Sequence, residues 1–87
     1  MKIRFESGEE GAARAIDGNV LILHSPRAFA PGSPIRFTVE LGDGARAFEG
    51  RTIGSRRVDD RRFDVRMRFV NLRRTDREAL AARLASG

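Results

Sequence analysis

The strongest constraint on the fold of this chain is a run of strictly alternating residues in its last third. Charged and apolar side chains alternate across residues 62–70, which places Asp64, Arg66 and Arg68 on one side of an extended backbone. The other side is apolar and consists of Phe63, Val65, Met67 and Phe69. A period of two is typical of a β-strand that buries one face and exposes the other. The chain must therefore build a sheet whose apolar face is covered.

The rest of the pattern predicts a mainly β protein. Strands are predicted at residues 1–7, 20–23, 35–41, 45–54 and 62–70. Residues 12–16 form either a further strand or a single helical turn. Turns are predicted at 17–19 and 42–44, a fixed loop at 24–34 because it holds all three prolines, and a charged hairpin loop at 56–61. Five or six short strands bury one face only by closing on themselves, so we expect a small barrel with a helix packed at one end.

Two strands carry more specific predictions. The run at 20–23 is uniformly apolar, which favours a strand buried on both faces or at the centre of a sheet. Phe48 and Ile53 are an odd number of residues apart. They therefore share a face only if a bulge at Gly50 or Gly54 shifts the alternation.

A short helix is predicted after the last strand. Thr75 and Glu78 have the spacing of a capping box, in which each side chain satisfies a backbone N–H at the helix start. Leu80 and Leu84 lie one turn apart on the same side of such a helix. We expect these two leucines to dock the helix onto the barrel.

Composition limits the classes of function. The 87 residues predict a single domain, 1–87, and the absence of cysteine excludes a disulfide framework and a cysteine-based metal site. No apolar run approaches the ~20 residues that span a bilayer, and no secretory signal opens the chain, so a cytoplasmic location is expected.

The net charge is +5, and sixteen of the seventeen basic residues are arginine. Arginine favours a nucleotide, a nucleic acid or an acidic protein surface as partner, although a GC-rich genome, which favours Arg over Lys, explains the same count.

The sequence offers little for catalysis, and we expect no enzyme activity, no metal site and no cofactor. His24 is predicted to lie in a loop next to Ser25, and neighbours in sequence do not make a catalytic triad. The acidic pairs at 9–10 and 59–60 are predicted to be solvated in loops. A nucleic-acid-binding small barrel is a second alternative, disfavoured because most phenylalanines fall on inward positions and no Tyr or Trp is present for base stacking.

Residues 20–84 resemble a PilZ domain in a divergent form. The matching segments, in order, are residues 21–23, 25–29, 31–35, 48–53 and 65–72. The last segment is similar to the family's strand that ends in Arg-Phe and is followed by a short helix with a pair of leucines. The resemblance implies a six-stranded antiparallel β-barrel with one C-terminal α-helix, in agreement with the fold expected from the alternation.

Typical PilZ domains bind the messenger cyclic di-GMP, and the resemblance implies two motifs for it. One is Arg-x-x-x-Arg near the N-terminus, and no such pair precedes residue 20 here. The other is Asp/Asn-x-Ser-x-x-Gly, and it aligns with residues 14–19, where Arg14, Ile16 and Asn19 replace the acid, the serine and the glycine. We therefore expect no binding of cyclic di-GMP at micromolar concentrations.

PilZ-like domains without these motifs resemble adaptors that act through protein contact in motility, type IV pilus or polarity signalling. The leading hypothesis is therefore a regulatory adaptor that binds a protein with an acidic surface, as a monomer or weak homodimer. The candidate contact residues are arginines of the last hairpin: Arg56, Arg57, Arg61, Arg62, Arg66 and Arg68. The alternative hypothesis is a cyclic di-GMP receptor with a rearranged arginine site, formed either by residues 56–62 or by Arg14, Asp17 and Asn19.

Overall fold

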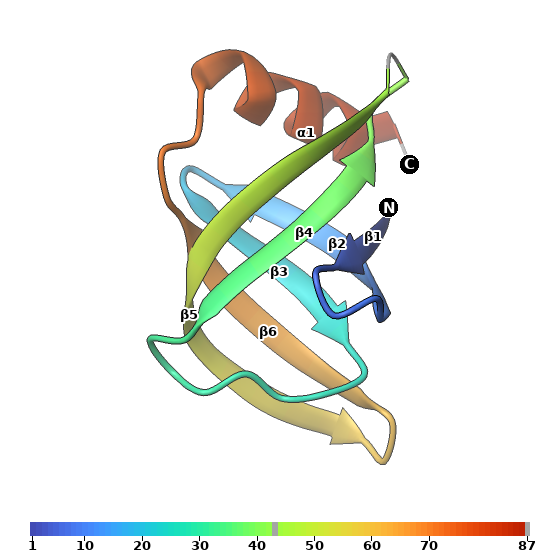
Figure 1. Cartoon of the computed structure of the whole chain (residues 1–87), viewed down its shortest axis with the longest axis vertical. Coiled ribbons are helices and arrows are strands. Elements are labelled where there is room, and N and C mark those ends of the chain that lie inside the picture. Colours follow the sequence, from blue (N-terminus) through green and yellow to red (C-terminus); the bar gives the residue numbers. More distant parts are fainter. Residues whose placement is uncertain (43, 87) are drawn as a thin grey trace.

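The computed structural model describes residues 1–42 and 44–86, which form six β-strands and one α-helix (Figure 1). The elements in chain order are β1 (Lys2–Phe5), β2 (Glu10–Asp17), β3 (Val20–Ser25), β4 (Pro34–Glu40), β5 (Ala45–Asp59), β6 (Arg62–Phe69) and α1 (Arg74–Ser86). The strands close into a barrel in the order β1-β2-β3-β6-β5-β4, with every neighbouring pair antiparallel. The predicted six-stranded antiparallel β-barrel with one C-terminal helix is confirmed. The predicted turn at 42–44 includes Asp43, which lies outside the described residues.

The barrel closes because the inward positions of its strands are apolar. The buried apolar side chains are Ile3, Phe5, Ala13, Leu21, Leu23, Phe29, Ile35, Phe37, Val39, Phe48, Val65, Met67, Phe69 and Leu80. In the centre, the rings of Phe37 and Phe48 stack with their centroids 5.6 Å apart, and Phe69 meets Phe48 edge-on at 6.0 Å. Aromatic pairs in these geometries add to the stabilisation that burial alone provides.

The six ladders are unequal in length. Strand β1 joins β4 through only two register pairs, Arg4 with Thr38 and Phe5 with Phe37. The backbone N–H of Glu6 adds one hydrogen bond to the carbonyl oxygen of Arg36 at 2.9 Å. By contrast, β3 and β6 pair along the whole of β3. The β1–β4 ladder, here called the seam, is therefore the weakest junction in the barrel.

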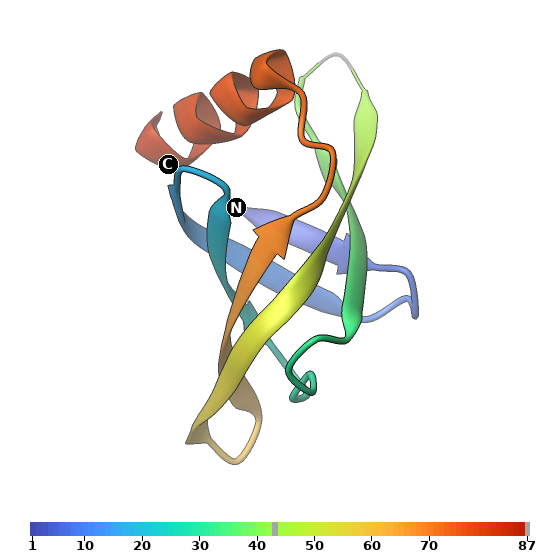
Figure 2. The ribbon, with the colours of Figure 1, turned by 90° about the vertical axis from the view of Figure 1, so that its left-hand side faces the viewer.

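The helix α1 lies across one end of the barrel (Figures 1 and 2). Leu80 is fully buried beneath it, and Leu84 is half-buried against the same core, as predicted. A side chain of the barrel holds the first turn as well, because Arg46 of β5 forms an ion pair with Asp76. The two contacts close this end of the core to water.

The predicted capping box is wrong. The helix begins at Arg74, so Thr75 already lies inside the first turn, and the backbone N–H of Arg77 donates to the carbonyl oxygen of Arg73 at 3.0 Å. The carboxylate of Glu78 accepts from Nε of Arg74 at 3.1 Å and does not reach back to the backbone. The spacing of a capping box was present, but the helix starts too early for these residues to use it.

The hairpin of β5 and β6 extends beyond the barrel at the end opposite the helix (Figure 2). Strand β5 continues to Asp59, so the predicted loop at 56–61 is wrong and only residues 60–61 form the turn. Neither side of the outermost part is covered by the core, so residues 56–61 are charged except Val58, which is 43% exposed. A charged sequence was therefore read as a loop although its backbone is paired.

Two bulges interrupt β5. The register with β6 shifts between Thr52 and Gly54 and again between Arg57 and Asp59, which leaves Ile53 and Val58 as extra residues. A bulge adjoining Gly54 was predicted, but it does not bring Ile53 inward. Phe48 is buried, whereas Ile53 remains 36% exposed, so the two do not share a face.

Strands β2 and β3 depart from expectation in different ways. Residues 12–16 belong to a strand, and a register shift at Arg14 explains why their alternation was weak. The apolar run in β3 is not buried on both faces, because Leu21 and Leu23 are fully buried while Ile22 is 37% exposed. The side chain of Ile22 therefore lies on the outside of the barrel wall, where it does not contribute to the core.

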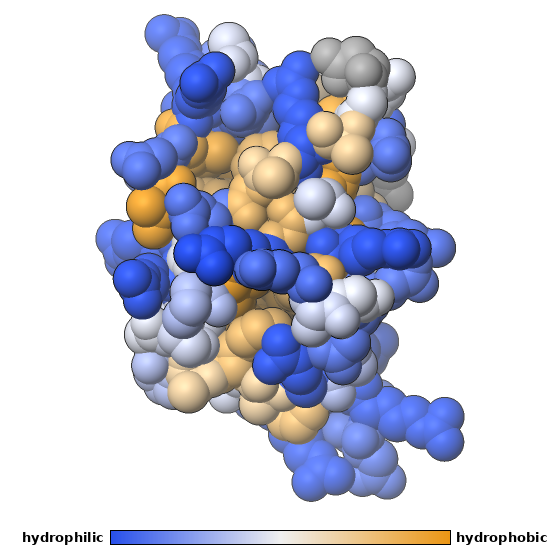
Figure 3. Space-filling view, viewed as in Figure 1, coloured by the Kyte–Doolittle hydropathy of each residue, from blue (hydrophilic) through white to orange (hydrophobic). Residues whose placement is uncertain are grey.

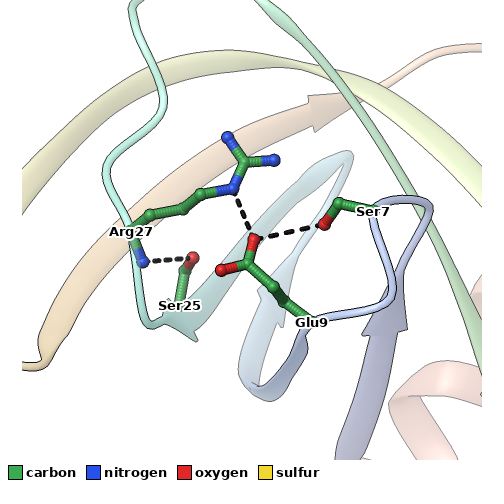
Figure 4. A network of polar contacts seen from close by, with 4 residues as sticks. All are labelled: Ser7, Glu9, Ser25 and Arg27. Carbon is green, nitrogen blue, oxygen red and sulfur yellow. Dashed lines mark hydrogen bonds and ion pairs between the residues drawn. The ribbon is translucent and has the colours of Figure 1, made fainter.

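The loop between β3 and β4 is tied to its neighbours by side chains. The hydroxyl of Ser55 accepts from the backbone N–H of Phe29 at 2.9 Å and donates to the carbonyl oxygen of Phe29 at 2.8 Å. Nε of Arg27 donates to the carboxylate of Glu9 at 2.6 Å, and the hydroxyl of Ser7 donates to the same oxygen at 3.2 Å (Figure 4). Glu9 therefore links this loop to the β1–β2 turn, although its side chain stays 40% exposed.

Candidate functional site

Six arginines of the last hairpin were the candidate contact residues, and Arg66 and Arg68 lie on the wall formed by β3, β6 and β5. The ladders align the side chains of this wall in three rows across the strands. From the hairpin tip towards the helix, the rows are His24, Asp64 and Arg56, then Ile22, Arg66 and Gly54, then Val20, Arg68 and Arg51. We call these residues the outer face.

The first row is internally paired. His24 lies in β3 and not in a loop, contrary to prediction, and its Nε2 is 2.8 Å from Oδ1 of Asp64. This is an ion-pair separation without the alignment of a hydrogen bond, since Oδ1 has no hydrogen-bond partner among the described residues. Nη2 of Arg56 donates to the other carboxylate oxygen at 3.4 Å. An acidic partner that binds Arg56 must therefore compete with Asp64.

The other rows hold arginines that have no counter-charge among the described residues. Arg51 stands directly opposite Arg68, and Arg66 follows on the same side of β6. All three are exposed, and within the described residues no carboxylate lies within 4.0 Å of any of them. Arg51 donates only to the carbonyl oxygen of Gly32, at 3.2 Å. Like charges opposite each other destabilise a sheet, so this arginine cluster costs stability unless an anion neutralises it.

A groove crosses the middle of the outer face. It has a volume of about 460 Å³ and is lined by Ile22, Gly54, Ser55, Arg56, Asp64 and Arg66. Gly54 leaves its floor open, since a methyl group there would meet no atom within 4 Å. Ile22 supplies an exposed apolar wall, and the exposed Ile53 adjoins Gly54 in sequence. The groove therefore combines an open floor at Gly54 and an apolar wall at Ile22 with the charged side chain of Arg66 between them, and Asp64 and Arg56 line its tip side.

The tip of the hairpin is less basic than its sequence suggests. Nη2 of Arg57 donates to Asp60 at 2.8 Å, and the backbone N–H of Arg61 donates to Oδ1 of Asp59, also at 2.8 Å. The acidic pair at 59–60 is therefore bonded within the tip, although the side chain of Asp60 remains 95% exposed. Arg61 and Arg62 are exposed. Figure 3 shows hydrophilic side chains projecting from this end of the molecule.

A wide cavity beside the tip does not suit an anion. Its volume is about 740 Å³, and its lining includes the carboxylates of Glu10, Asp59 and Asp60 as well as Arg61 and Arg62. A phosphate or nucleotide in this cavity would meet negative charge from two sides. The tip and its cavity are therefore a weaker anion site than the arginine cluster.

The residues of the alternative cyclic di-GMP site do not gather around one space. Arg14, at the bulge of β2, lines a cavity of about 420 Å³ together with Arg83 of the helix. Asp17 and Asn19 flank the β2–β3 turn, and the carbonyl oxygen of Asn19 accepts from the backbone N–H of Phe69 at 2.8 Å. This turn lies near the helix, whereas the arginines of 56–62 lie at the opposite end (Figure 1). The two proposed arginine sites cannot combine.

Residues 1–42 and 44–86 contain no group of three or more His, Asp or Glu side chains placed to hold a metal ion. Their one helix is neither long nor apolar enough to cross a membrane.

Sequence reasoning missed three residues of the outer face: Arg51, Gly54 and Ile22. The exposed position of Ile22 could have been found, because Leu21 and Leu23 on either side of it must face the core if the strand alternates. The partners of Arg51 and Gly54 could not, because they depend on the two bulges in β5.

Comparisons of the chain with protein-family models, with curated proteins and with solved structures find no match.

Proposed function

We propose that this chain is a PilZ-like regulatory adaptor that binds an acidic surface of a protein partner through the arginine cluster. The observation that carries the proposal is the cross-strand pair of Arg51 and Arg68, joined by Arg66 and left without a carboxylate among the described residues. Arginine is enriched at protein interfaces and binds carboxylates bidentately. Arg61 and Arg62 at the tip are exposed as well, but Asp64 and its partner Arg56 separate them from the cluster, so they have at most a secondary part in the proposed contact.

The fold supports the PilZ-like part of the proposal. A closed six-stranded antiparallel barrel with one C-terminal helix is the architecture that the resemblance implies. The cyclic di-GMP motifs are replaced at Arg14, Ile16 and Asn19, so the messenger would lack its polar contacts. We therefore place the chain among adaptors of bacterial motility, pilus or polarity signalling in the cytoplasm, with no cofactor and no catalysis.

Nucleic-acid binding is the weaker candidate. Single-strand binders stack bases on exposed aromatic rings. Five phenylalanines here are buried, and the sixth, Phe63, is half-buried against the core. The aromatic side chains stabilise the barrel and leave no platform for a base.

The decisive experiment is affinity capture from cells that make the protein, with two double variants of equal charge change. Arg66→Glu with Arg68→Glu reverses the arginine cluster, whereas the control, Arg73→Glu with Arg83→Glu, reverses two exposed arginines at the helix end. We expect a partner that the wild type and the control retain and the cluster variant loses, with retention falling as salt rises. Recovery of the same partners by all three proteins would contradict the proposal.

Calorimetry with cyclic di-GMP tests the remaining alternative. We expect no saturable heat below ~10 μM, because loss of two charge-assisted contact groups costs far more than the ~1.4 kcal/mol of one decade in affinity. Saturable binding in that range would replace the adaptor hypothesis by a messenger receptor, and an Arg14→Ala variant would then show whether the β2 arginine carries it.

A further inference from the structure

We infer that the outer-face groove receives one apolar side chain from an acidic segment of the partner protein. The inference rests on the proposed function and states what the partner must look like. Its binding segment combines carboxylates for the arginine cluster with a leucine-sized residue for the space above Gly54. The contact then has an apolar centre and a charged flank, which is the usual anatomy of a protein interface.

The apolar half of the site follows from Gly54 and Ile22. A Cβ on Gly54 would meet nothing within 4 Å, so the space above the strand is open and the glycine is not required by close packing. Its φ lies outside the left-handed region, so no turn requires it either. Ile22 stands two strands away in the same row and is 37% exposed. Together they leave apolar surface in water that a partner's side chain can cover.

The charged half of the site determines that the partner's binding segment is negatively charged. Arg66 stands in the row of Ile22 and Gly54, between the two, and the opposed Arg51 and Arg68 follow in the next row towards the helix, with no described carboxylate neighbour to any of the three. Towards the tip, Asp64 is already paired with Arg56, at 3.4 Å. An acidic segment therefore gains from the helix side of the groove and gains little from the tip side, and this gives the contact a direction.

A second copy of the chain does not fit this description. A symmetric contact places the same patch of both copies face to face. The two arginine clusters would then oppose each other, and like charges across an interface are strongly unfavourable. Charge complementarity thus selects a different, acidic protein.

The inference is tested with two synthetic peptides and amide chemical-shift titration of the isotope-labelled protein. Both peptides consist of glutamate and aspartate, with a central leucine in one and a central serine in its twin. Burial of the leucine should make the first peptide bind about 10-fold more tightly. The amide signals of Ile22, Gly54 and Arg66 should shift most. A single-stranded oligonucleotide at the same salt concentration is a third ligand, and it should bind more weakly than the leucine peptide.

Two single variants separate the apolar and charged halves. Gly54→Gln places a neutral polar side chain over the floor, and it should abolish the difference between the peptides while the serine peptide binds as before. Ala47→Gln, at an exposed position on another part of β5, should leave the difference unchanged. The signal dispersion of both variants reports directly whether they are folded.

The outcomes distinguish this inference from the proposed function. Equal affinity of the two peptides for the wild type, including no detectable binding of either, would overturn the groove assignment, as would tighter binding of the oligonucleotide. The proposed function is tested separately, by whether the variant with the reversed arginine cluster loses the captured partner. A leucine preference that Gly54→Gln removes and Ala47→Gln keeps would support the inference.

Discussion

The atoms around each glycine of β5 determine whether a residue with a side chain can replace it. A Cβ on Gly50 would lie 2.4 Å from the carbonyl oxygen of Arg68 and 2.5 Å from Cε of Met67. The first of these is backbone and cannot move without disturbing the ladder. On the same strand, Gly54 faces open space. One glycine is therefore required by close approach of two strands, and the other is required by nothing in the fold.

This difference gives a paired stability prediction. Gly50→Ala should lower the free energy of unfolding by about 1–3 kcal/mol, because the added methyl group overpacks the strand contact. Gly54→Ala should change it by no more than about 0.5 kcal/mol. Urea denaturation of the two variants and the wild type measures both values. Equal midpoints for Gly50→Ala and Gly54→Ala would contradict the contacts at Gly50.

Ser55 gives a second prediction at the same scale. Its hydroxyl bonds to both the N–H and the carbonyl oxygen of Phe29, so Ser55→Ala leaves two partly buried backbone groups unpaired. We expect a loss of about 1–3 kcal/mol in the free energy of unfolding. Ser7→Ala removes an exposed hydroxyl and serves as the control, with an expected change within about 0.5 kcal/mol. If thermal melting shows equal losses in both variants, the loop is not anchored at Ser55.

The pairing of Arg51 with Arg68 is a residue-level feature that could not be predicted from the sequence. An uninterrupted ladder from the turn at 60–61 would put Ile53 opposite Arg68. Bulges at Ile53 and Val58 shift β5 by two positions, so that Arg51 stands there instead. A bulge depends on local backbone geometry and not on a residue pattern, and the cluster was therefore invisible in the alternation.

At the scale of elements, the strands with complete apolar alternation were predictable. Residues 35–41 and 62–70 were expected as strands, and β4 and β6 match them to within one residue at each end. The failures have one cause, which is that the core does not impose a period of two everywhere. Strand β2 bulges at Arg14, and the far part of β5 leaves the barrel altogether.

The attachment of α1 is the clearest prediction at the element scale. Leu80→Ala should cost about 2–5 kcal/mol in the free energy of unfolding, because Leu80 is fully buried and the barrel end cannot collapse around the cavity. Leu84→Ala should cost clearly less, since Leu84 is half-buried. Denaturant titrations followed by helical circular dichroism measure both losses. A larger effect at Leu84 would mean that the helix docks through its last turn.

At the scale of the whole molecule, the arrangement separates the core from the proposed contact residues. The helix closes one end of the barrel, the extended hairpin leaves the other, and the outer face occupies the wall between them (Figure 2). The groove and the arginine cluster use outward positions, whose inward neighbours Val65 and Met67 are fully buried. The proposed contact residues can therefore be changed without altering the core, which is what makes the charge-reversal experiment interpretable.

The short seam between β1 and β4 has a consequence for motion. Two register pairs and the bond from Glu6 to Arg36 hold it, so opening here breaks few interactions compared with separation of β3 from β6. Native-state hydrogen exchange should show the amide of Glu6 exchanging through local openings, orders of magnitude faster than amides of the β3–β6 ladder. Equal protection at both places would show that the barrel opens only as a unit.

In the closed order of strands, the seam lies diametrically across from the junction of β3 with β6. A partner bound to the outer face would therefore contact the wall opposite the seam and leave the seam itself uncovered. The seam between β1 and β4 would remain able to open locally while the partner is bound. Association would therefore reduce the protein's internal mobility little, and its entropic cost would be small.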